Sequence, residues 1–326
     1  MHADPATGAG DGRVSLAPIA LFVYNRPAHT RRTLEHLARC AGFSASRLVV
    51  FCDGPKSSGD TDAVHAARRV VHELAAAAEI VEATANRGLA ASIIGGVGRL
   101  VGESGRVIVV EDDLIVHPAF LEFLNAGLDR FADAERVMQV SGHLVPVPSF
   151  ANRRDALFLP FTTTWGWATW ERAWQHFNPD VSGSVVLDRD GAMRRRFNLD
   201  ESYDYAFMMA LQRAGAIDAW GPRWYWSVFA CNGLVLFPPQ SLVQNAGMDG
   251  SGTNGWISRL FHASEVSPAA GAVVPELPAS VAVNPVDLAA VCQAVARQSG
   301  GPLRHLLDAM RRLRYRSVLS SKSAGS

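Results

Sequence analysis

The sequence is poor in the features that assign a function from composition alone. Its 326 residues contain only four cysteines, spaced far apart with no CxxC pair, so they indicate neither a zinc site nor a disulfide framework. Basic and acidic residues balance at a formal net charge of zero, which argues against nucleic acid as a partner. No stretch approaches the roughly 18 apolar residues of a membrane span.

The opening residues, "MHADPATGAGDGR", have neither a basic start nor an apolar core, so they do not resemble a secretory leader. We therefore expect a cytoplasmic protein. With 48% hydrophobic and 19% charged residues, the chain has the composition of a globular protein with a sizeable core.

The first third of the chain alternates apolar runs of strand length with helical patterns. The expected strands are 18–24, 47–52, 79–83 and 106–110, and the expected helices between them are 28–40, 61–78 and 88–101. Strands this apolar have no wet face, so the order predicts a parallel sheet covered by helices on both sides. The carboxyl ends of such strands share one edge, where ligands of these sheets bind.

Polar side chains follow each of the four strands at this edge. They are Asn25 and Arg26, then Asp53, then Asn86 and Arg87, and finally Glu111, Asp112 and Asp113. Each group alone has a local explanation, because Asp53 begins an Asp-Gly-Pro turn and Asp112 or Asp113 can cap the following helix. Together they favour a nucleotide-type site.

Three consecutive acids make the last group unusual. In a strand, Glu111 and Asp113 share one side and Asp112 points to the other. Two carboxylates would repel a diphosphate by about 4 kcal/mol per unit pair at ~4 Å and an effective dielectric constant of about 20. A divalent cation removes this conflict, and carboxylate oxygens suit Mg²⁺ or Mn²⁺. The pattern predicts such a metal ion between the acids and a diphosphate.

The regular alternation stops after residue 117. We expect a helix at 118–132, strands at 137–142 and 156–161, and helices at 190–198 and 201–214. The predicted organisation comprises a disordered segment 1–16, a nucleotide-binding half 17–116, an acceptor and lid half 117–262 of the same domain, a linker 263–284, C-terminal helices 285–319 and a disordered tail 320–326.

With these motifs in view, the chain resembles glycosyltransferases of the GT-A fold. The segment "VIVVEDDLIVHPAFLEFL" is similar to the strand, acidic motif and helix of N-acetylglucosaminyltransferase I and of bacterial family 2-like sugar transferases. The likeness continues through "LFVYNRPAHTRRTLEHL", "FCDGP", "MQVSG", "TTTWGWATW", "ESYDYAF" and "QNAGMDGSGTN", over roughly residues 17 to 256. It implies an α/β fold with a mostly parallel, Rossmann-like sheet flanked by helices, a C-terminal acceptor and lid region, and a helical tail.

The resemblance also implies roles for the residues of the acidic edge. Arg26 corresponds to an arginine that holds the nucleotide, and Asp53 to the acid that reads the uracil ring. Glu111 and Asp112 correspond to the pair that reaches the donor sugar and the ribose. Asp113 corresponds to the acid that binds the metal.

The resemblance further implies a transfer that inverts the anomeric carbon of the donor sugar. Such a transfer requires a base on the acceptor side. In the family this base lies near the start of a later helix, where "SYDYAF" offers Asp204, with Asp200 and Glu201 as competitors. The match departs from the family, because a double acid flanked by tryptophan is replaced by one acid between two tyrosines. The local alternative is that Asp200 and Glu201 cap the helix.

Four tryptophans stand close together in "TTTWGWATWERAW". Trp167, Trp170 and Trp174 recur at spacings of three and four, which predicts a helix that buries one face. Trp165 and Gly166 precede this stripe, and we expect them to form a wall between donor sugar and acceptor. The glycine-rich "GMDGSGTNG" is expected to close over the diphosphate, although it can equally be a surface loop.

The function expected is an inverting, metal-dependent glycosyltransferase that uses a nucleotide sugar, with UDP-sugar favoured, and a glycan or lipid-linked acceptor in bacterial surface polysaccharide assembly. The arginine-rich helix at 303–316 is expected to touch the inner face of the cytoplasmic membrane, or else to pack or face solvent. One alternative is a nucleotidyltransferase, which needs a glycine-rich loop after the first strand. Another is a non-catalytic glycan- or nucleotide-binding protein. A glycosidase fits adjacent acids poorly.

Overall fold

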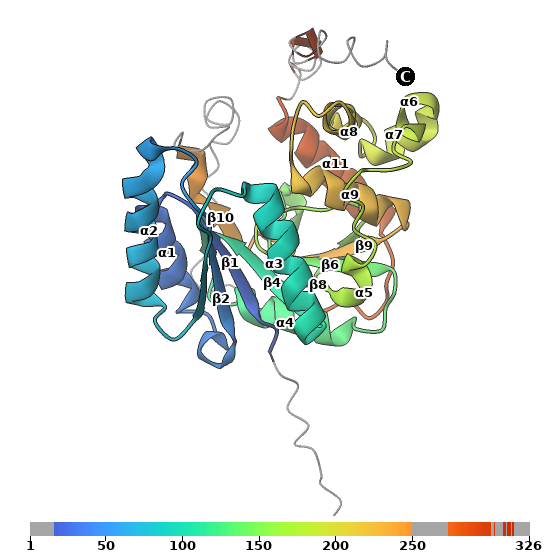
Figure 1. The fold of residues 1–326 in the computed structure, drawn as a ribbon. Helices are drawn as coiled ribbons and strands as arrows, with labels where there is room; N and C mark the ends of the chain where they lie inside the picture. The colour runs from blue at the N-terminus through green and yellow to red at the C-terminus, as the bar shows by residue number, and fades with distance from the viewer. Residues whose placement is uncertain are drawn as a thin grey trace, which may run out of the picture.

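The computed structural model describes residues 16–249 and 273–300, together with residues 303, 309, 310, 312, 313 and 315. The main feature of the fold is an eight-stranded sheet with the order β3-β2-β1-β4-β8-β6-β9-β7. A two-stranded sheet, β10-β5, lies beside it. Figure 1 shows the sheets and the helices around them.

The first four strands of the large sheet are parallel, as the sequence predicted. They are β1 (Ile19–Val23), β2 (Leu48–Cys52), β3 (Glu79–Glu82) and β4 (Arg106–Glu111). The helices that connect them are α1 (Pro27–Leu37), α2 (Thr61–Leu74) and α3 (Leu89–Ser104). The short turns η1 (Phe43–Ala45) and η2 (Ser58–Asp60) complete this half.

The direction in which the chain crosses the sheet reverses after β3. From β1 to β3 each strand is added on the same side, whereas α3 carries the chain back past β1 to β4. Right-handed crossovers therefore place α1 and α2 on one face and α3 on the other. In agreement, α1 packs against α2, and α3 packs over β4 and β1. The neighbouring strands β1 and β4 thus form a topological switch point, where ligands of such sheets bind.

The second half adds four strands to the large sheet, in both parallel and antiparallel pairs, and forms the two-stranded sheet. Its strands are β5 (Leu114–Val116), β6 (Val137–Ser141), β7 (Leu157–Leu159), β8 (Trp167–Trp170), β9 (Leu234–Phe237) and β10 (Val243–Asn245). The helices and turns are α4 (Phe120–Arg130), η3 (Pro148–Phe150), α5 (Glu171–Trp174), α6 (Val186–Arg189), α7 (Gly191–Phe197), α8 (Tyr205–Arg213), α9 (Trp220–Ala230), η4 (Ala246–Asp249) and α11 (Pro285–Gln298). The predicted architecture, a mostly parallel α/β sheet flanked by helices, is confirmed.

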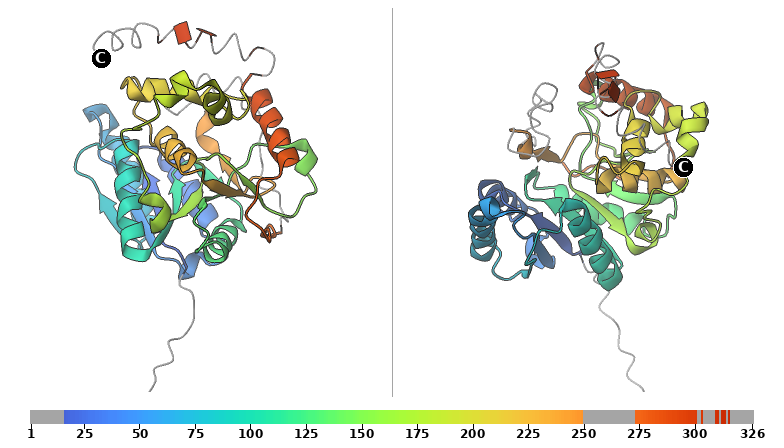
Figure 2. Two further views of the ribbon diagram at one scale, coloured as in Figure 1. Left: turned by 90° about the vertical axis from the view of Figure 1, so that its right-hand side faces the viewer. Right: turned by 45° about the horizontal axis from the view of Figure 1, so that its top comes forward.

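Three of the later helices, α8, α9 and α11, gather on one side of the molecule. Figures 1 and 2 show α8, α9 and α11 together, opposite to the start of β1. Because β1 and β4 run toward this side, their carboxyl ends face the region below α8 and α9. None of the helices within the described ranges is long and apolar enough to cross a bilayer.

Some of the expected elements differ from those observed. Trp167–Trp170 form the strand β8, and only Glu171–Trp174 are helical, so the helix predicted across the tryptophan stripe is wrong. The helix expected at 201–214 begins at Tyr205, and α9 was not expected at all. From residue 273 the expected linker runs beside Arg154–Ala156, where Glu276 exchanges backbone hydrogen bonds of 3.0 and 2.8 Å.

Several predicted segments lie wholly or mostly outside the described residues, among them the disordered ends expected at 1–16 and 320–326 and the part of the linker before residue 273. The loop 247–255 is described only as far as residue 249, and most of the arginine-rich helix 303–316 is not described.

Candidate functional site

The switch point between β1 and β4 brings Arg26 together with two of the three acids. Arg26 ends the three-residue loop after β1 and is followed at once by Pro27, the first residue of α1. Its Nη2 lies 3.0 Å from Asp113 Oδ2 and 3.4 Å from Asp112 Oδ1. The structure therefore places these predicted site residues in direct contact.

Asp112 points into the protein and joins β4 to β1. Its Oδ2 accepts a hydrogen bond of 3.1 Å from the backbone N–H of Tyr24, and its backbone oxygen accepts one of 2.8 Å from the Thr33 hydroxyl. Burial raises the pKa of Asp112 to about 6, although the positive charge of Arg26 opposes this shift. Asp112 therefore fixes the loop after β1, which carries Arg26, to the carboxyl end of β4.

Glu111 is the acid of the three whose negative charge is least balanced by nearby positive charge. Burial and the negative charges of Asp113 and Asp112 raise the pKa of Glu111 to about 8, while Arg26 lowers it. The single guanidinium of Arg26 thus pairs with Asp112 and Asp113 and lies near the charge of Glu111. The local charge favours the binding of a cation.

Asp113 has one carboxylate oxygen available for a ligand. Its Oδ2 pairs with Arg26, whereas its buried Oδ1 has no hydrogen-bond partner among the described residues. An unpaired buried carboxylate oxygen is costly unless something binds it. Among the described residues no three His, Cys, Asp or Glu side chains form a metal cluster. The arrangement fits a hard cation held by one carboxylate, with phosphate and water oxygens as its other ligands.

The segment after β10 covers Asp113. The backbone N–H of Ala246 donates to the Asp113 backbone oxygen at 2.8 Å, and the Ala246 oxygen lies 3.3 Å from His29 Nε2. Gly247 packs so closely that a Cβ there would lie 2.2 Å from Asp113 Oδ2 and 2.7 Å from Arg26 Nη1. Only glycine fits here without displacing a neighbour. The resemblance included Gly247 within its segment, but nothing in the sequence indicated this contact.

Asp53 lies at the end of β2 and binds the loop after β3. Its Oδ1 accepts from the backbone N–H groups of Gly54 and Arg87, both at 2.8 Å. Its Oδ2 accepts from the backbone N–H of Gly88 at 3.0 Å and from Asn86 Nδ2 at 3.1 Å. The predicted residues Asp53, Asn86 and Arg87 are therefore joined to one another.

Asn25 is directed away from the acids. Its Nδ2 donates to Asp60 Oδ1 at 3.4 Å, in the turn before α2. The structure thus does not bring Asn25 into the group formed by Arg26, Asp112 and Asp113.

Trp165 and Gly166 stand at the start of β8, between the two sheets. Gly166 has φ +60° and its oxygen accepts from the backbone N–H of Gly142 at 2.7 Å. The half-buried ring of Trp165 lies 4.3 Å, centroid to centroid, from the ring of His143. His143 Nδ1 lies 2.8 Å from Ser241 Oγ. His143 and Ser241 therefore support Trp165, a role for which the sequence offers no signal.

The remaining tryptophans of the stripe belong to the core, as predicted, even though β8 replaces the helix. Trp167 stacks on Trp220 at 5.2 Å, and both Trp167 and Trp174 adjoin Trp224. Trp224 Nε1 donates to Gln139 Oε1 at 2.7 Å. These rings connect the sheet to α9.

Asp204 caps the amino end of α8. Its Oδ1 accepts from the backbone N–H of Phe207 at 3.3 Å and lies 3.5 Å from Asn198 Nδ2. Its Oδ2 accepts from Arg312 at 3.1 Å through Nε and at 2.5 Å through Nη2. The Asp204 side chain is 11% exposed and that of Arg312 is 59% exposed. Asp204, and not Asp200 or Glu201, is therefore the helix cap.

The two competing acids lie in an unusual turn before Asp204. Leu199, Asp200 and Glu201 all have positive φ, at +49°, +55° and +62°. Asp200 pairs with Arg195, and Glu201 accepts from Asn198 Nδ2 at 3.3 Å. Three consecutive residues in the left-handed region are strained unless the surrounding contacts hold them.

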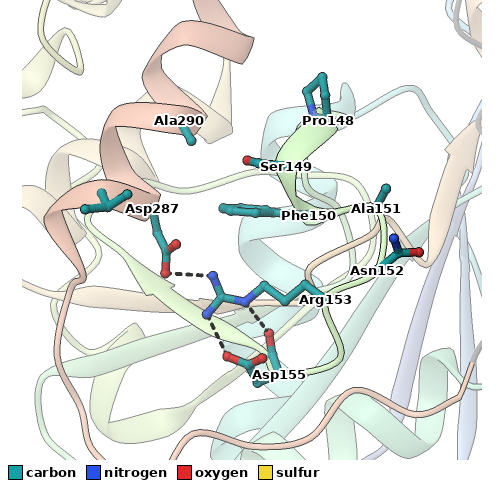
Figure 3. Close-up of a pocket in the computed structure, with 10 residues that line it drawn as sticks. Pro148, Ser149, Phe150, Ala151, Asn152, Arg153, Asp155, Asp287 and Ala290 are labelled. Carbon is teal, nitrogen blue, oxygen red and sulfur yellow. Dashed lines mark hydrogen bonds and ion pairs between the residues drawn. The ribbon is translucent and has the colours of Figure 1, made fainter.

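A separate hollow of about 500 Å³ lies between η3 and α11. Figure 3 shows Arg153 in this hollow between two acids, 2.7 Å from Asp155 Oδ2 and 2.7 Å from Asp287 Oδ2. The guanidinium also lies over the Phe150 ring, 5.1 Å from its centroid. Because Arg153 is fully engaged, this cluster fastens α11 to the body of the protein.

Comparisons with known proteins give distant structural neighbours. No family model matches the sequence, and a search among curated proteins found no match. GalNAc-T7, solved with UDP, GalNAc and Mn²⁺, aligns at 11% identity and a TM-score of 0.42, over 71% of this chain and 44% of that one. The chain thus spans less than half the length of this neighbour.

Two further neighbours are more distant. CMP:2-keto-3-deoxy-manno-octonic acid synthetase with CTP aligns at 11% identity and a TM-score of 0.32, over 56% of this chain and 86% of that one. Glucosyl-3-phosphoglycerate synthase from Mycobacterium tuberculosis, with Mn²⁺, UDP and glucosyl-3-phosphoglycerate, aligns at 15% identity and a TM-score of 0.30, over 53% and 64%. Similarity this distant does not assign a function to this chain.

Proposed function

We propose that the protein is an inverting, metal-dependent glycosyltransferase that moves a sugar from a nucleotide diphosphate, preferably UDP, to a hydroxyl group. The observation that carries this proposal is the switch point, where Arg26, Asp112 and Asp113 meet and Asp113 Oδ1 has no partner within the described part of the chain. In this proposal Asp113 holds Mn²⁺ or Mg²⁺, which neutralises charge on the departing diphosphate. Arg26, whose buried Nη1 also has no hydrogen-bond partner among the residues that the structure describes, is proposed to donate to the nucleotide.

The loop after β1 favours this function over nucleotide-sugar synthesis. Only Tyr24, Asn25 and Arg26 separate β1 from α1, and none of them is glycine. A triphosphate cradle made of backbone N–H groups requires a longer, glycine-rich loop. The site is therefore better suited to a diphosphate donor.

We propose Asp204 as the base that takes the proton from the acceptor hydroxyl. It belongs to α8, on the side that the carboxyl ends of β1 and β4 face, and it is separate from the donor-side acids (Figure 1). Both of its oxygens are engaged in this conformation, Oδ2 by Arg312. Proton transfer therefore requires Arg312 to withdraw from Oδ2.

The acceptor that we propose is a glycan or a lipid-linked sugar of a bacterial surface polysaccharide. The supporting feature is the arginine-rich sequence at 303–316, which can rest on an anionic lipid surface at the inner face of the cytoplasmic membrane. Trp165, beside His143, is proposed to separate donor sugar from acceptor.

Titration calorimetry with UDP tests the donor site. The wild type is expected to bind UDP in the presence of Mn²⁺ and to lose this binding in EDTA. Asp113→Ala is expected to bind UDP as weakly in the presence of Mn²⁺ as the wild type does in EDTA. Its melting temperature should be unchanged without ligand, because Arg26 keeps Asp112 as a partner.

Asp129→Ala is the matched control for this variant. Asp129 is an acid that pairs with Arg106, at the opposite end of β4. The control should bind UDP like the wild type. Equal UDP affinity with Mn²⁺ and with EDTA would refute the metal-dependent donor site.

A further inference from the structure

The carboxylate of Asp53 is saturated by hydrogen bonds from its own protein. It receives four N–H donors at 2.8 to 3.1 Å, two on each oxygen, and the residue is only 9% exposed. A carboxylate offers about four lone-pair positions. No position is left for an N–H group of a nucleobase unless one of the four donors is displaced and left unsatisfied.

The donors come from two loops that Asp53 joins. Gly54 follows Asp53 directly, whereas Asn86, Arg87 and Gly88 lie between β3 and α3. The junction is reinforced by Arg68, whose Nη2 donates to the backbone oxygens of Asp53 at 3.1 Å and Ala83 at 2.6 Å.

The two loops are also in tight steric contact. A Cβ on Gly54 would lie 2.5 Å from the backbone carbon of Ala85, so the main chains touch there. Gly88, at φ +79°, then turns the chain into α3. The Asp53 side chain thus binds Asn86, Arg87 and Gly88, all three residues of this turn.

We infer that Asp53 is a positioning residue, which fixes Asn86, Arg87 and Gly88 at the nucleotide site and does not itself contact the nucleobase. As far as it concerns nucleotide binding, this inference rests on the proposed function. The hydrogen-bonded junction can be tested in the protein without nucleotide.

Asp53→Asn tests the inference because it preserves shape but reverses part of the polarity. The amide oxygen can keep two donors, while the amide NH₂ faces the N–H of Gly88 and the side chain of Asn86. In nucleotide-free protein the amides of Arg87 and Gly88 should exchange hydrogen faster by about tenfold or more, the effect of losing one net hydrogen bond.

Nucleotide selectivity separates positioning from direct reading of the base. Uracil has an N3–H that a carboxylate can accept, whereas cytosine N3 is itself an acceptor. If Asp53 positions the loop, Asp53→Asn weakens UDP and CDP by the same factor, about tenfold. If Asp53 instead contacts uracil directly, Asp53→Asn should bind UDP more weakly than the wild type does, while its affinity for CDP stays the same.

Two further variants keep the test decisive. Val291→Ala, on the buried face of α11 and 0% exposed, should lower the melting temperature without changing nucleotide affinity. Asn86→Ala removes one of the four donors and should reproduce the effects of Asp53→Asn in weaker form. This variant replaces Asp53→Asn in the test if Asp53→Asn does not fold.

Unchanged exchange at Arg87 and Gly88, together with a selective loss of UDP, would overturn the inference. If the wild type binds neither UDP nor CDP, the proposed function fails, and the exchange rates alone still decide whether Asp53 holds the turn.

Discussion

Gly247→Ala is the substitution whose effect can be worked out most directly from the structure. The added Cβ would lie 2.2 Å from Asp113 Oδ2, well inside the distance at which such atoms normally approach. Either η4 moves away or the Asp113 carboxylate turns, which breaks its 3.0 Å pair with Arg26. Overpacking of this kind costs roughly 1 to 3 kcal/mol.

The expected readout is Mn²⁺-dependent binding of UDP, measured by titration calorimetry. If the displacement falls on Asp113, the affinity should drop by about 5- to 150-fold, the factor that corresponds to roughly 1 to 3 kcal/mol. Neither the wild type nor Gly247→Ala should bind UDP in EDTA, because the proposed site requires the metal ion.

Gly102→Ala is the control for this experiment. Gly102 lies exposed in α3, and a Cβ there would meet no atom within 4 Å. Alanine should stabilise this helix by about 0.5 to 1 kcal/mol and leave binding intact. If Gly247→Ala binds UDP and melts like the wild type, the close covering of Asp113 by η4 is wrong.

The remaining predictions concern the acceptor-side base and the thiols. Asp204→Asn should reduce the rate of sugar transfer by a factor of about 10² to 10⁴ while the affinity for UDP stays the same. Arg312→Ala should not reduce the rate. A normal rate of transfer by Asp204→Asn would exclude Asp204 as the base. Burial raises the pKa of Cys52 to about 12 and that of Cys40 to about 11, so both remain thiols at pH 8. Iodoacetamide should then alkylate the exposed Cys231 first, and mass spectrometry that finds early labelling of Cys52 would contradict the buried assignment.

The donor half of the fold could be predicted because its signals are local. The strands β1 to β4 are short apolar runs separated by helical patterns, and their observed bounds differ from the predicted ones by one residue or less at each end. Parallel order then places Arg26 and the acids at one edge without further information. The contact of Arg26 with Asp113 follows from this arrangement.

The tryptophan stripe misled the prediction for a physical reason. Strand β8 pairs with β4 on one side and β6 on the other, and all four of its residues are buried. A strand buried on both faces has no alternation of polar and apolar residues. Trp170 ends the strand and Trp174 ends the one-turn α5, so spacings of three and four arose without a continuous helix.

The acceptor side depended on contacts between residues distant in sequence. Arg312 reaches Asp204 across 108 positions, and Ser241 reaches His143 across 98. No periodicity or motif reports such pairs. The alternative in which Asp200 and Glu201 cap α8 is wrong because the left-handed turn at Leu199–Glu201 delays the helix until Tyr205.

The charge at the switch point links the fold to the proposed chemistry. Asp112 is committed to the backbone of Tyr24, so it builds the site and contributes charge that Arg26 only partly offsets. Glu111, with its pKa raised to about 8, shows how unfavourable a further negative charge is at this place. A diphosphate that arrived alone would add repulsion of about 4 kcal/mol per unit pair at ~4 Å. Under the proposed function a diphosphate donor therefore requires a cation, and Asp113 Oδ1, which has no partner among the described residues, is the proposed ligand.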